Sequence, residues 1–347
     1  MSLLPRPAFA SVLLALLLLL VLVVVVAIGA GSVPIPPLRV ARLLVAAIGE
    51  PWSGPDADSE LVILMALRVP RVFVAVMVGA ALAVSGAQMQ GLFQNPMASP
   101  DVIGTSTGAA FGAVLAFVFG LAASHMAWVP VLACLGAALS LAAIYGLTTR
   151  RGRTPVAMLL LAGVALNALL SAATSFVISL SWVRYEVAQE VVFWLMGGLE
   201  DRTWTHVWMA APPIAIGLAA AVALARELDL FTTGEEAAAT LGVDVERAKL
   251  RVLAVAALLT GTAVAVCGVL GFVGLIVPHA VRLVVGPAHR RLLPTAAVAG
   301  AIFVVAADLV ARTALAPLEI PLGIITGICG APFFLWLLSR YRREVGA

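Results

Sequence analysis

Three arginines lie at the ends of long apolar segments, where a guanidinium group could bind a carboxylate. Arg68 and Arg71 belong to the sequence LRVPR, and Arg312 belongs to ADLVART. Because Asp308 precedes Arg312 by one helical turn, the two side chains could pair on one helix face, and Glu319 is also near in sequence. The alternative is a basic rim that docks an acidic partner, since complementary charges fix the register of an interface. The sequence leaves both interpretations open.

A second polar feature is the segment 228–251, which interrupts a chain in which 63% of the residues are hydrophobic. Within it, Thr233 and Glu236 have the spacing of a capping box at the start of a helix. Glu235 and Glu236 would lie where the helix dipole favours negative charge, and Gly242 would end the helix. The predicted helix is only about two turns long, and such a helix is marginal in water by itself. We therefore expect it to bind another protein.

A third polar feature is the loop 92–108, LFQNPMASPDVIGTSTG, which joins two apolar segments. Asn95-Pro96 and Ser99-Pro100 favour rigid turns within it. Irregular polar backbone at membrane depth usually lines a cavity. The loop is therefore either an ordinary helix connection or a constriction on a permeation path.

The residues expected of an enzyme are missing from the sequence. A nucleotide-binding P-loop needs Gly-Lys-Ser/Thr, but the one lysine, Lys249, is followed by leucine. The four histidines have no metal-ligand spacing, and the three cysteines form no CxxC motif. Asp308 is the one acid clearly inside an apolar segment, which gives a proton relay little support. We expect no catalytic residue, no metal site and no cofactor on this chain. For a transporter, the energy would come from another subunit.

Membrane-spanning helices must position these residues. The mean hydropathy is +1.11, and only 11% of the residues are charged. The sequence predicts an all-α polytopic membrane protein of one domain, 1–347, which includes the polar segment 228–248. A short apolar helix at 188–199 is expected not to cross the membrane. The sequence predicts ten membrane helices, of which the eighth is short, at about 9–29, 69–91, 103–121, 127–147, 155–178, 205–224, 249–268, 271–285, 292–313 and 321–340.

The distribution of basic residues predicts the orientation. With the N-terminus inside, the inner segments hold Arg6, Arg150, Arg151, Arg153, Arg226, Arg247, Lys249, Arg251, Arg282, Arg290, Arg291, Arg340, Arg342 and Arg343. The outer segments hold half as many, namely Arg39, Arg42, Arg68, Arg71, Arg184, Arg202 and Arg312. Because cytoplasmic loops carry the excess of Arg and Lys, both termini and the segment 228–251 are predicted to be cytoplasmic. The net charge of +3 does not indicate nucleic-acid binding.

Five separated motifs resemble one protein family. The first, RVPRVFVAVMVGAALAVSGAQMQGLFQNPMASPDVIGTSTG, is similar to the signature of the FecCD-type permeases. These are the membrane subunits of vitamin-B12-type (type II) ABC importers for ferric siderophores, haem and cobalamin. The other motifs follow in the same order over nearly all of the chain, namely GEEAAATLGVDVERAK, GFVGLIVPHAVR, AADLVART and LEIPLGIITGICGAPFFLWLL.

The resemblance implies a ten-helix subunit with the vitamin-B12-importer permease fold, working as a homodimer with one central path. It also implies two ATPase subunits in the cytoplasm, which would bind ATP and Mg, and a periplasmic binding protein outside. The positions that match the docking arginines are Arg68, Arg71 and Arg312. Those that match the cytoplasmic gate are Asn95, Pro96 and Met97, where many members have leucine in place of Met97. Those that match the ATPase-coupling helix are Thr233, Gly234, Glu235, Glu236, Ala239, Leu241 and Gly242.

The expected function is therefore import of an iron chelate, a ferric siderophore or haem, across the bacterial inner membrane. A cobalamin importer of the same family is the alternative within this class. From a different class, an ion-driven secondary transporter would need an essential ionisable residue at mid-membrane, and the sequence offers little beyond Asp308. A membrane-embedded enzyme has no cluster of histidine, cysteine and carboxylate residues to support it.

Overall fold

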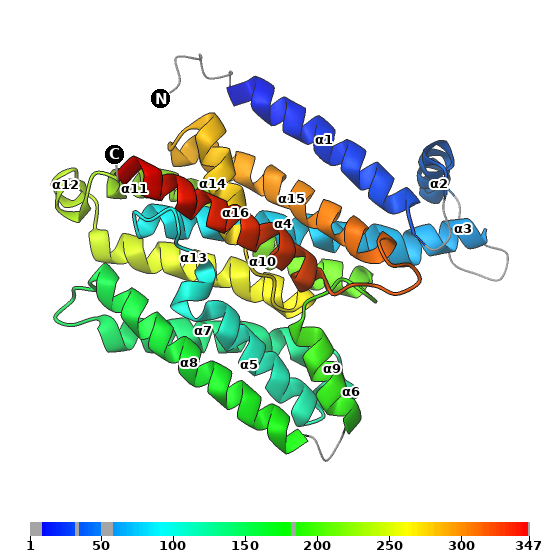
Figure 1. The fold of residues 1–347 in the computed structure, drawn as a ribbon, viewed down its shortest axis with the longest axis horizontal. Helices are drawn as coiled ribbons and strands as arrows, with labels where there is room; N and C mark the ends of the chain where they lie inside the picture. Colours follow the sequence, from blue (N-terminus) through cyan, green and yellow to red (C-terminus); the bar gives the residue numbers. More distant parts are fainter. Residues whose placement is uncertain (1–8, 32–34, 50–57, 182–184, 346–347) are drawn as a thin grey trace.

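The computed structural model describes residues 9–31, 35–49, 58–181 and 185–345, and the regular elements in these ranges are helices (Figure 1). In chain order they are α1 (Phe9–Gly29), α2 (Pro37–Gly49), α3 (Ser59–Val62), the π-helical η1 (Ile63–Arg68), α4 (Val69–Leu92), the 3-10 helix η2 (Pro100–Ile103), α5 (Thr105–Val118), α6 (Leu121–Ser124), α7 (Trp128–Thr148), α8 (Val156–Ser181), α9 (Tyr185–Leu195), α10 (Trp204–Ala223), α11 (Ala225–Phe231), α12 (Glu235–Thr240), α13 (Val245–Cys267), α14 (Val273–Val285), α15 (His289–Thr313) and α16 (Leu322–Val345).

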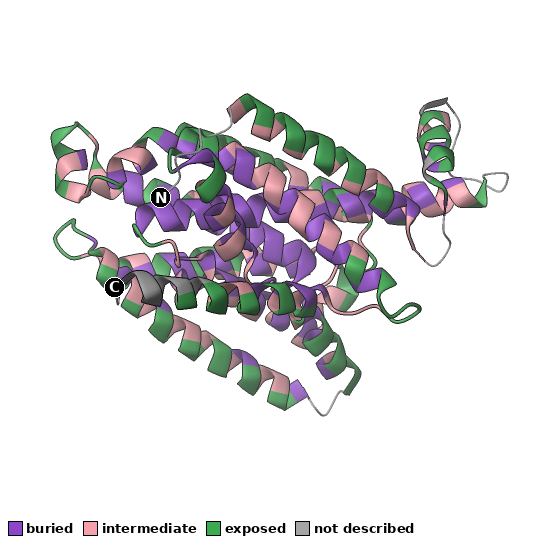
Figure 2. Ribbon diagram, turned by 45° about the horizontal axis from the view of Figure 1, so that its top comes forward, coloured by how far each residue is buried: buried purple, intermediate pink, exposed green. Residues whose placement is uncertain are grey.

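Helix α4 forms the centre of the bundle, because apart from Gln88 and Gln90 its buried part carries only apolar or small residues. All residues from Val78 to Leu92 are buried. A helix that is apolar all round is a buried helix rather than a surface one. Its neighbours are α10, α13, α14 and α15. Figure 2 shows the buried residues gathered in the middle of the bundle.

Two glycines of α4 permit its closest helix contacts. A Cβ atom at Gly86 would lie 1.8 Å from the carbonyl oxygen of Gly274 in α14. A Cβ atom at Gly79 would lie 2.2 Å from the carbonyl oxygen of Gly300 in α15. Small residues let helix backbones approach closely in a membrane, so larger side chains here would force the helices apart. This packing holds the middle of α4 against α15 and its C-terminal half against α14.

Helices α1 and α8 lie at the periphery of the bundle. In their most apolar stretches, only 17% of the residues of α1 and 11% of those of α8 are buried. Their exposed residues include large apolar ones such as Leu18 and Leu169. Such surfaces suit lipid or another apolar helix rather than water.

Each predicted membrane span coincides with a helix: α1, α4, α5, α7, α8, α10, α13, α14, α15 and α16. Among the described residues, seven helices are long and apolar enough to cross a membrane, with α3, η1 and α4 counted as one 34-residue stretch. The others, α5, α14 and the apolar part of α16 (Leu322–Trp336), are shorter. The structure thus shows a helical protein with seven such helices, and the count of ten crossings stays a prediction. Helix α9 is the short helix expected at 188–199.

Helix α12, the start of α1 and the end of α16 lie on one side of the bundle, and α2 and α3 lie on the opposite side (Figure 1). Helix α4 runs between these two sides. Of the basic residues used to predict the orientation, Arg6 and Arg184 lie outside the described residues.

Candidate functional site

The three arginines expected to bind carboxylates converge on one hollow. It has a volume of about 290 Å³, and its lining includes Arg68, Arg71, Arg312 and Glu319. Arg68 is the last residue of η1, and Arg71 lies in the first turn of α4. Arg312 lies in the last turn of α15. We call these three arginines, together with Asp308 and Glu319, the arginine cluster.

Arg71 is held by two carboxylates from distant parts of the chain. Its Nε and Nη2 donate to Asp308 Oδ1 at 3.1 and 2.8 Å. Its Nη1 and Nη2 donate to Glu319 Oε1 and Oε2 at 3.0 and 2.8 Å. The side chain of Asp308 is 1% exposed and that of Glu319 is 31% exposed. Asp308 and Glu319, the two carboxylates expected to pair with Arg312, therefore bind mainly Arg71, which lies 237 and 248 positions away in the sequence.

Arg68 and Arg312 bind the C-terminal end of α1. Arg68 Nη1 donates to the carbonyl oxygens of Ile28 and Gly29 at 3.1 and 2.9 Å. Arg312 Nη1 donates to Ala30 O at 2.8 Å, and its Nη2 donates to Ala27 O. The last carbonyls of a helix lack intrahelical partners and carry partial negative charge, so two guanidinium groups stabilise this helix end. The predicted pair of Arg312 with Asp308 is also present, at a longer distance of 3.5 Å.

Arg202 is a further basic residue of this hollow that the sequence did not single out. It follows Glu200 and Asp201 in the turn before α10, and all three line the hollow. Burial lowers the pKa of Arg202. Burial first, and then the carboxylates of Glu319 and Asp201, raise the pKa of Glu200. No sequence motif marks this turn. It lies beside the arginine cluster because of the packing of α4, α10 and α15, which a local sequence pattern does not reveal.

The loop expected to form a gate follows the other end of α4. Asn95 is exposed, and Pro96 and Met97 are half-buried. The Asn95 Oδ1 atom accepts a hydrogen bond from the Met97 backbone N–H at 2.9 Å, which makes a rigid Asx turn. Gln94 Nε2 donates to the carbonyl oxygen of Phe231 in α11. The loop is therefore bonded directly to the helix that precedes α12.

Helix α11 is bonded in turn to the start of α15. Asp229 Oδ1 accepts a hydrogen bond from the His289 backbone N–H at 2.7 Å and lies 2.7 Å from His289 Nδ1. Burial acts to raise the pKa of Asp229, but the bonds from His289 outweigh it and lower that pKa. One short helix thus joins the gate loop, α15 and α12.

The predicted capping box at α12 is wrong. The helix begins at Glu235, its N-cap is Gly234 without a side-chain bond, and the Thr233 hydroxyl donates to Leu230 O at 2.8 Å instead. Gly234 has a φ of 101°, a left-handed conformation that only glycine adopts without strain. Because Gly234 turns the chain there, the Thr233 side chain is directed back to α11.

The other end of α12 is as predicted. Gly242 has a φ of 85°, and its N–H donates to Ala239 O at 3.0 Å. The Val243 N–H donates to Ala238 O at 3.1 Å, and together these bonds make a Schellman motif. Ala238 is fully buried, whereas the side chain of Leu241 is 59% exposed. One face of α12 therefore packs against the rest of the protein, and the other face is exposed.

The two glutamates of α12 differ in their contacts. Glu236 is exposed and has no ion pair with another described residue. Glu235 Oε2 lies 2.7 Å from Lys249 Nζ, so this carboxylate is already bound within the chain. Of the two charges expected to meet a partner, Glu236 is the one that projects from the surface.

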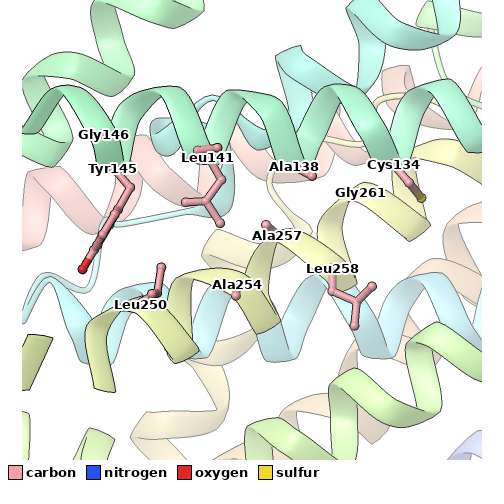
Figure 3. Close-up of a pocket in the computed structure, with 11 residues that line it drawn as sticks. Cys134, Ala138, Leu141, Tyr145, Gly146, Leu250, Ala254, Ala257, Leu258 and Gly261 are labelled. Atoms are coloured by element: carbon pink, nitrogen blue, oxygen red, sulfur yellow. The ribbon is translucent and has the colours of Figure 1, made fainter. Parts of the chain in front are cut away.

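A separate hollow of about 520 Å³ lies between α7 and α13 (Figure 3). Its lining is nearly all alanine, glycine and leucine, and the polar groups on it are the Cys134 thiol and the Tyr145 hydroxyl. It offers apolar contact and no set of groups for catalysis. Among the described residues, no group of three or more His, Cys, Asp or Glu side chains could hold a metal ion.

The family model described as the FecCD transport family matches residues 18–340. The chain belongs to the FecCD transport family. The resemblance seen in the five sequence motifs is thus confirmed.

Individual FecCD relatives match most of the chain. The cobalamin import system permease protein BtuC of Halobacterium salinarum is 47% identical over 91% of this chain and 82% of its own length. The hemin transport system permease protein HmuU of Yersinia pestis is 41% identical, over 84% of this chain and 88% of its own. The Fe(3+) dicitrate permease FecD of Escherichia coli is 38% identical, over 86% and 94%.

The fold of this FecCD chain is also found in a solved structure. An inward-facing conformation of a metal-chelate type ABC transporter superposes with a TM-score of 0.81 and 32% sequence identity. The match covers 96% of this chain and 99% of the other. The helical bundle is therefore that of an ABC transporter of this type.

Proposed function

We propose that this chain is the permease subunit of an ABC importer in the inner membrane. It works as a homodimer of single permease domains, each with ten membrane crossings. The observation that carries the proposal is that α4 has the predicted docking arginines at one end and the predicted gate residues at the other. Arg68 and Arg71 lie at its N-terminal end, and Asn95, Pro96 and Met97 follow its C-terminal end. At 1.5 Å per residue, α4 extends about 36 Å, enough to join a docking site on one membrane face to a gate near the other.

We place the α12 side in the cytoplasm, together with both termini, and dock α12 on an ATP-binding cassette subunit. The exposed Glu236 and Leu241 supply charge and apolar surface for that contact. Exposed arginines on the same side, including Arg150, Arg151 and Arg290, agree with the positive-inside rule. ATP and Mg bind to the ATPase subunits, because the single lysine of this chain is followed by leucine and cannot form a P-loop.

On the opposite side, we place the docking site for a periplasmic substrate-binding protein at the arginine cluster. Arg71 is occupied by Asp308 and Glu319. An acidic group of the binding protein would replace Glu319, the more exposed of the two carboxylates, and would leave the buried bond to Asp308 in place. Docking then exchanges one partner of Arg71 without exposing a buried charge.

Replacing Glu319 with glutamine should therefore strengthen docking. We expect the Kd for the substrate-binding protein to fall about twofold to fivefold, since an exposed ion pair contributes at most about 1 kcal/mol. The measurement is a titration of the binding protein onto the purified permease. Glu60→Gln is the control, because Glu60, on α3, pairs instead with Arg39 on α2. Weaker docking of Glu319→Gln would show that Glu319 itself contacts the partner.

For the substrate, we propose a large metal chelate. The named relatives carry cobalamin, hemin and ferric dicitrate, which share this chemistry. An iron chelate is the leading candidate, and cobalamin is the alternative. Competition between labelled haem, ferric siderophore and cobalamin for uptake by the reconstituted complex decides between them.

An ion-driven mechanism finds no support in the arrangement of Asp308. Its carboxylate is bound by Arg71 and lies beside Arg312. A carboxylate that carries protons or sodium through a transport cycle must release such partners, whereas here Arg71 donates three hydrogen bonds to Asp308. The proposal is tested by whether purified permease and ATPase together import a chelate only when ATP is supplied.

A further inference from the structure

Lys249 is the only lysine of the chain, and its ammonium group is buried where three segments meet. Nζ donates to Glu235 Oε2 at 2.7 Å, to Glu246 Oε1 at 3.1 Å and to Thr154 O at 2.9 Å. The Lys249 side chain is 1% exposed. Because an ammonium group has three donors, these bonds satisfy it completely.

The ion pairs of Lys249 are buried and hold α12 in a fixed position on α13, unlike an exposed surface pair. A buried charge is tolerated only where it is paired and hydrogen-bonded, so Lys249 cannot easily leave its partners. Glu246 lies in the first turn of α13, where the helix dipole also favours its charge. Glu235 is the first residue of α12, a helix of six residues that is too short to hold its position alone. The Glu235–Lys249 pair therefore attaches α12 to α13.

The third partner joins this site to α8. Thr154 is separated from α8 by Pro155 alone, and it is 1% exposed. Its hydroxyl lies 2.8 Å from the Thr149 hydroxyl, which closes the turn between α7 and α8. With 11% of its apolar stretch buried, α8 is the least buried of the seven long helices. Besides its packing on α5, α7 and η2, α8 is thus linked at its N-terminal end to α12 and α13 through Lys249.

We propose that Lys249 is a positioning residue that transmits displacement of α12 to the N-terminal end of α8 and to α13. Glu235 acts as the link to Lys249 and not as a contact for the ATPase. This inference rests on the proposed function, because α12 is displaced only when an ATPase subunit holds it. It adds a route by which that displacement reaches the membrane helices.

The test uses the complete complex of permease, ATPase and binding protein in proteoliposomes, with haem, ferric dicitrate and cobalamin as probes. Complex assembly, ATP hydrolysis and chelate imported per ATP are measured separately. For Glu235→Gln we expect normal assembly and a fall in chelate imported per ATP of at least about fivefold, the lower end of coupling between two sites. Lys249→Met should give the same loss. The double variant should lose no more than the larger single loss, because both changes break one link.

Glu227→Gln is the matched control, since it removes a carboxylate from α11 that has no ion pair among the described residues. It should keep the wild-type amount of chelate imported per ATP. A wild-type ratio in assembled Glu235→Gln, or losses that multiply in the double variant, would overturn the proposal. If Lys249→Met does not assemble, Glu235→Gln decides alone, because Glu235 is 42% exposed and glutamine keeps its shape. ATP-independent uptake by the unaltered complex would contradict the proposed function, and this proposal with it.

Discussion

Replacing Asp308 with asparagine should destabilise the protein by about 3–5 kcal/mol, the usual cost of removing one partner from a buried ion pair. Asp308 is 1% exposed and is the inner carboxylate bound by Arg71. It also lies 3.5 Å from Arg312. Without its charge, two largely buried guanidinium groups lose their shared anion, and the ends of α4 and α15 lose the pair that joins them. The measurement is the unfolding of the purified protein in detergent.

Glu319→Gln makes the same acid-to-amide change on the other side of Arg71. Because Glu319 is 31% exposed, its loss should cost about 1 kcal/mol or less. Equal losses for the two variants would show that Arg71 is hydrated and that Asp308 has no special structural role. Comparing the two variants shows which carboxylate of Arg71 stabilises the fold and which one is available for exchange with a docking partner.

Glu236→Lys should lower the affinity for the ATPase subunit by about tenfold or more, since like charges brought together at an interface cost several kcal/mol. The new lysine would also oppose the dipole at the start of α12. The measurement is the Kd of the purified ATPase subunit for the permease in detergent. The folded bundle should be unaffected, because Glu236 is exposed.

Glu227→Lys is the control for this charge reversal, because Glu227 lies on α11 and outside the predicted contact segment. Its effect on the affinity should be small. Equal weakening by both substitutions would point to a general electrostatic effect of the whole α12 side of the bundle. An unchanged affinity for Glu236→Lys would show that α12 docks without its exposed carboxylate.

The sequence predicts where the helices and the polar segments lie, because these depend on local patterns. The apolar stretches coincide with helices, and Gly242 ends α12 through a Schellman motif. The capping box fails because Gly234 takes the N-cap position with a positive φ. Spacing alone does not distinguish a threonine that caps a helix from one that turns back to α11.

The partners of the charged residues were out of reach of the sequence. Arg71 binds Asp308 across 237 positions, and Arg68 binds the end of α1 across about 40. Such pairs follow from helix packing, in particular from the close approach of α4 to α15 at Gly79. Because Asp308 and Arg312 are one helical turn apart, the sequence suggested that Asp308 pairs mainly with Arg312. In the structure Asp308 lies closer to Arg71, at 2.8 Å, than to Arg312, at 3.5 Å. Likewise, the sequence shows Lys249 as an isolated lysine but does not reveal its buried contacts.

The most direct test of the central claim is chelate uptake by proteoliposomes that hold this permease, its ATPase and its binding protein. ATP is supplied on the α12 side, and labelled haem, ferric dicitrate or cobalamin is added on the side of the arginine cluster. We predict uptake of one of these chelates that requires both the ATPase subunit and ATP, and that is absent when a proton or sodium gradient is imposed without them. Uptake driven by the ion gradient, with no ATPase present, would contradict the account.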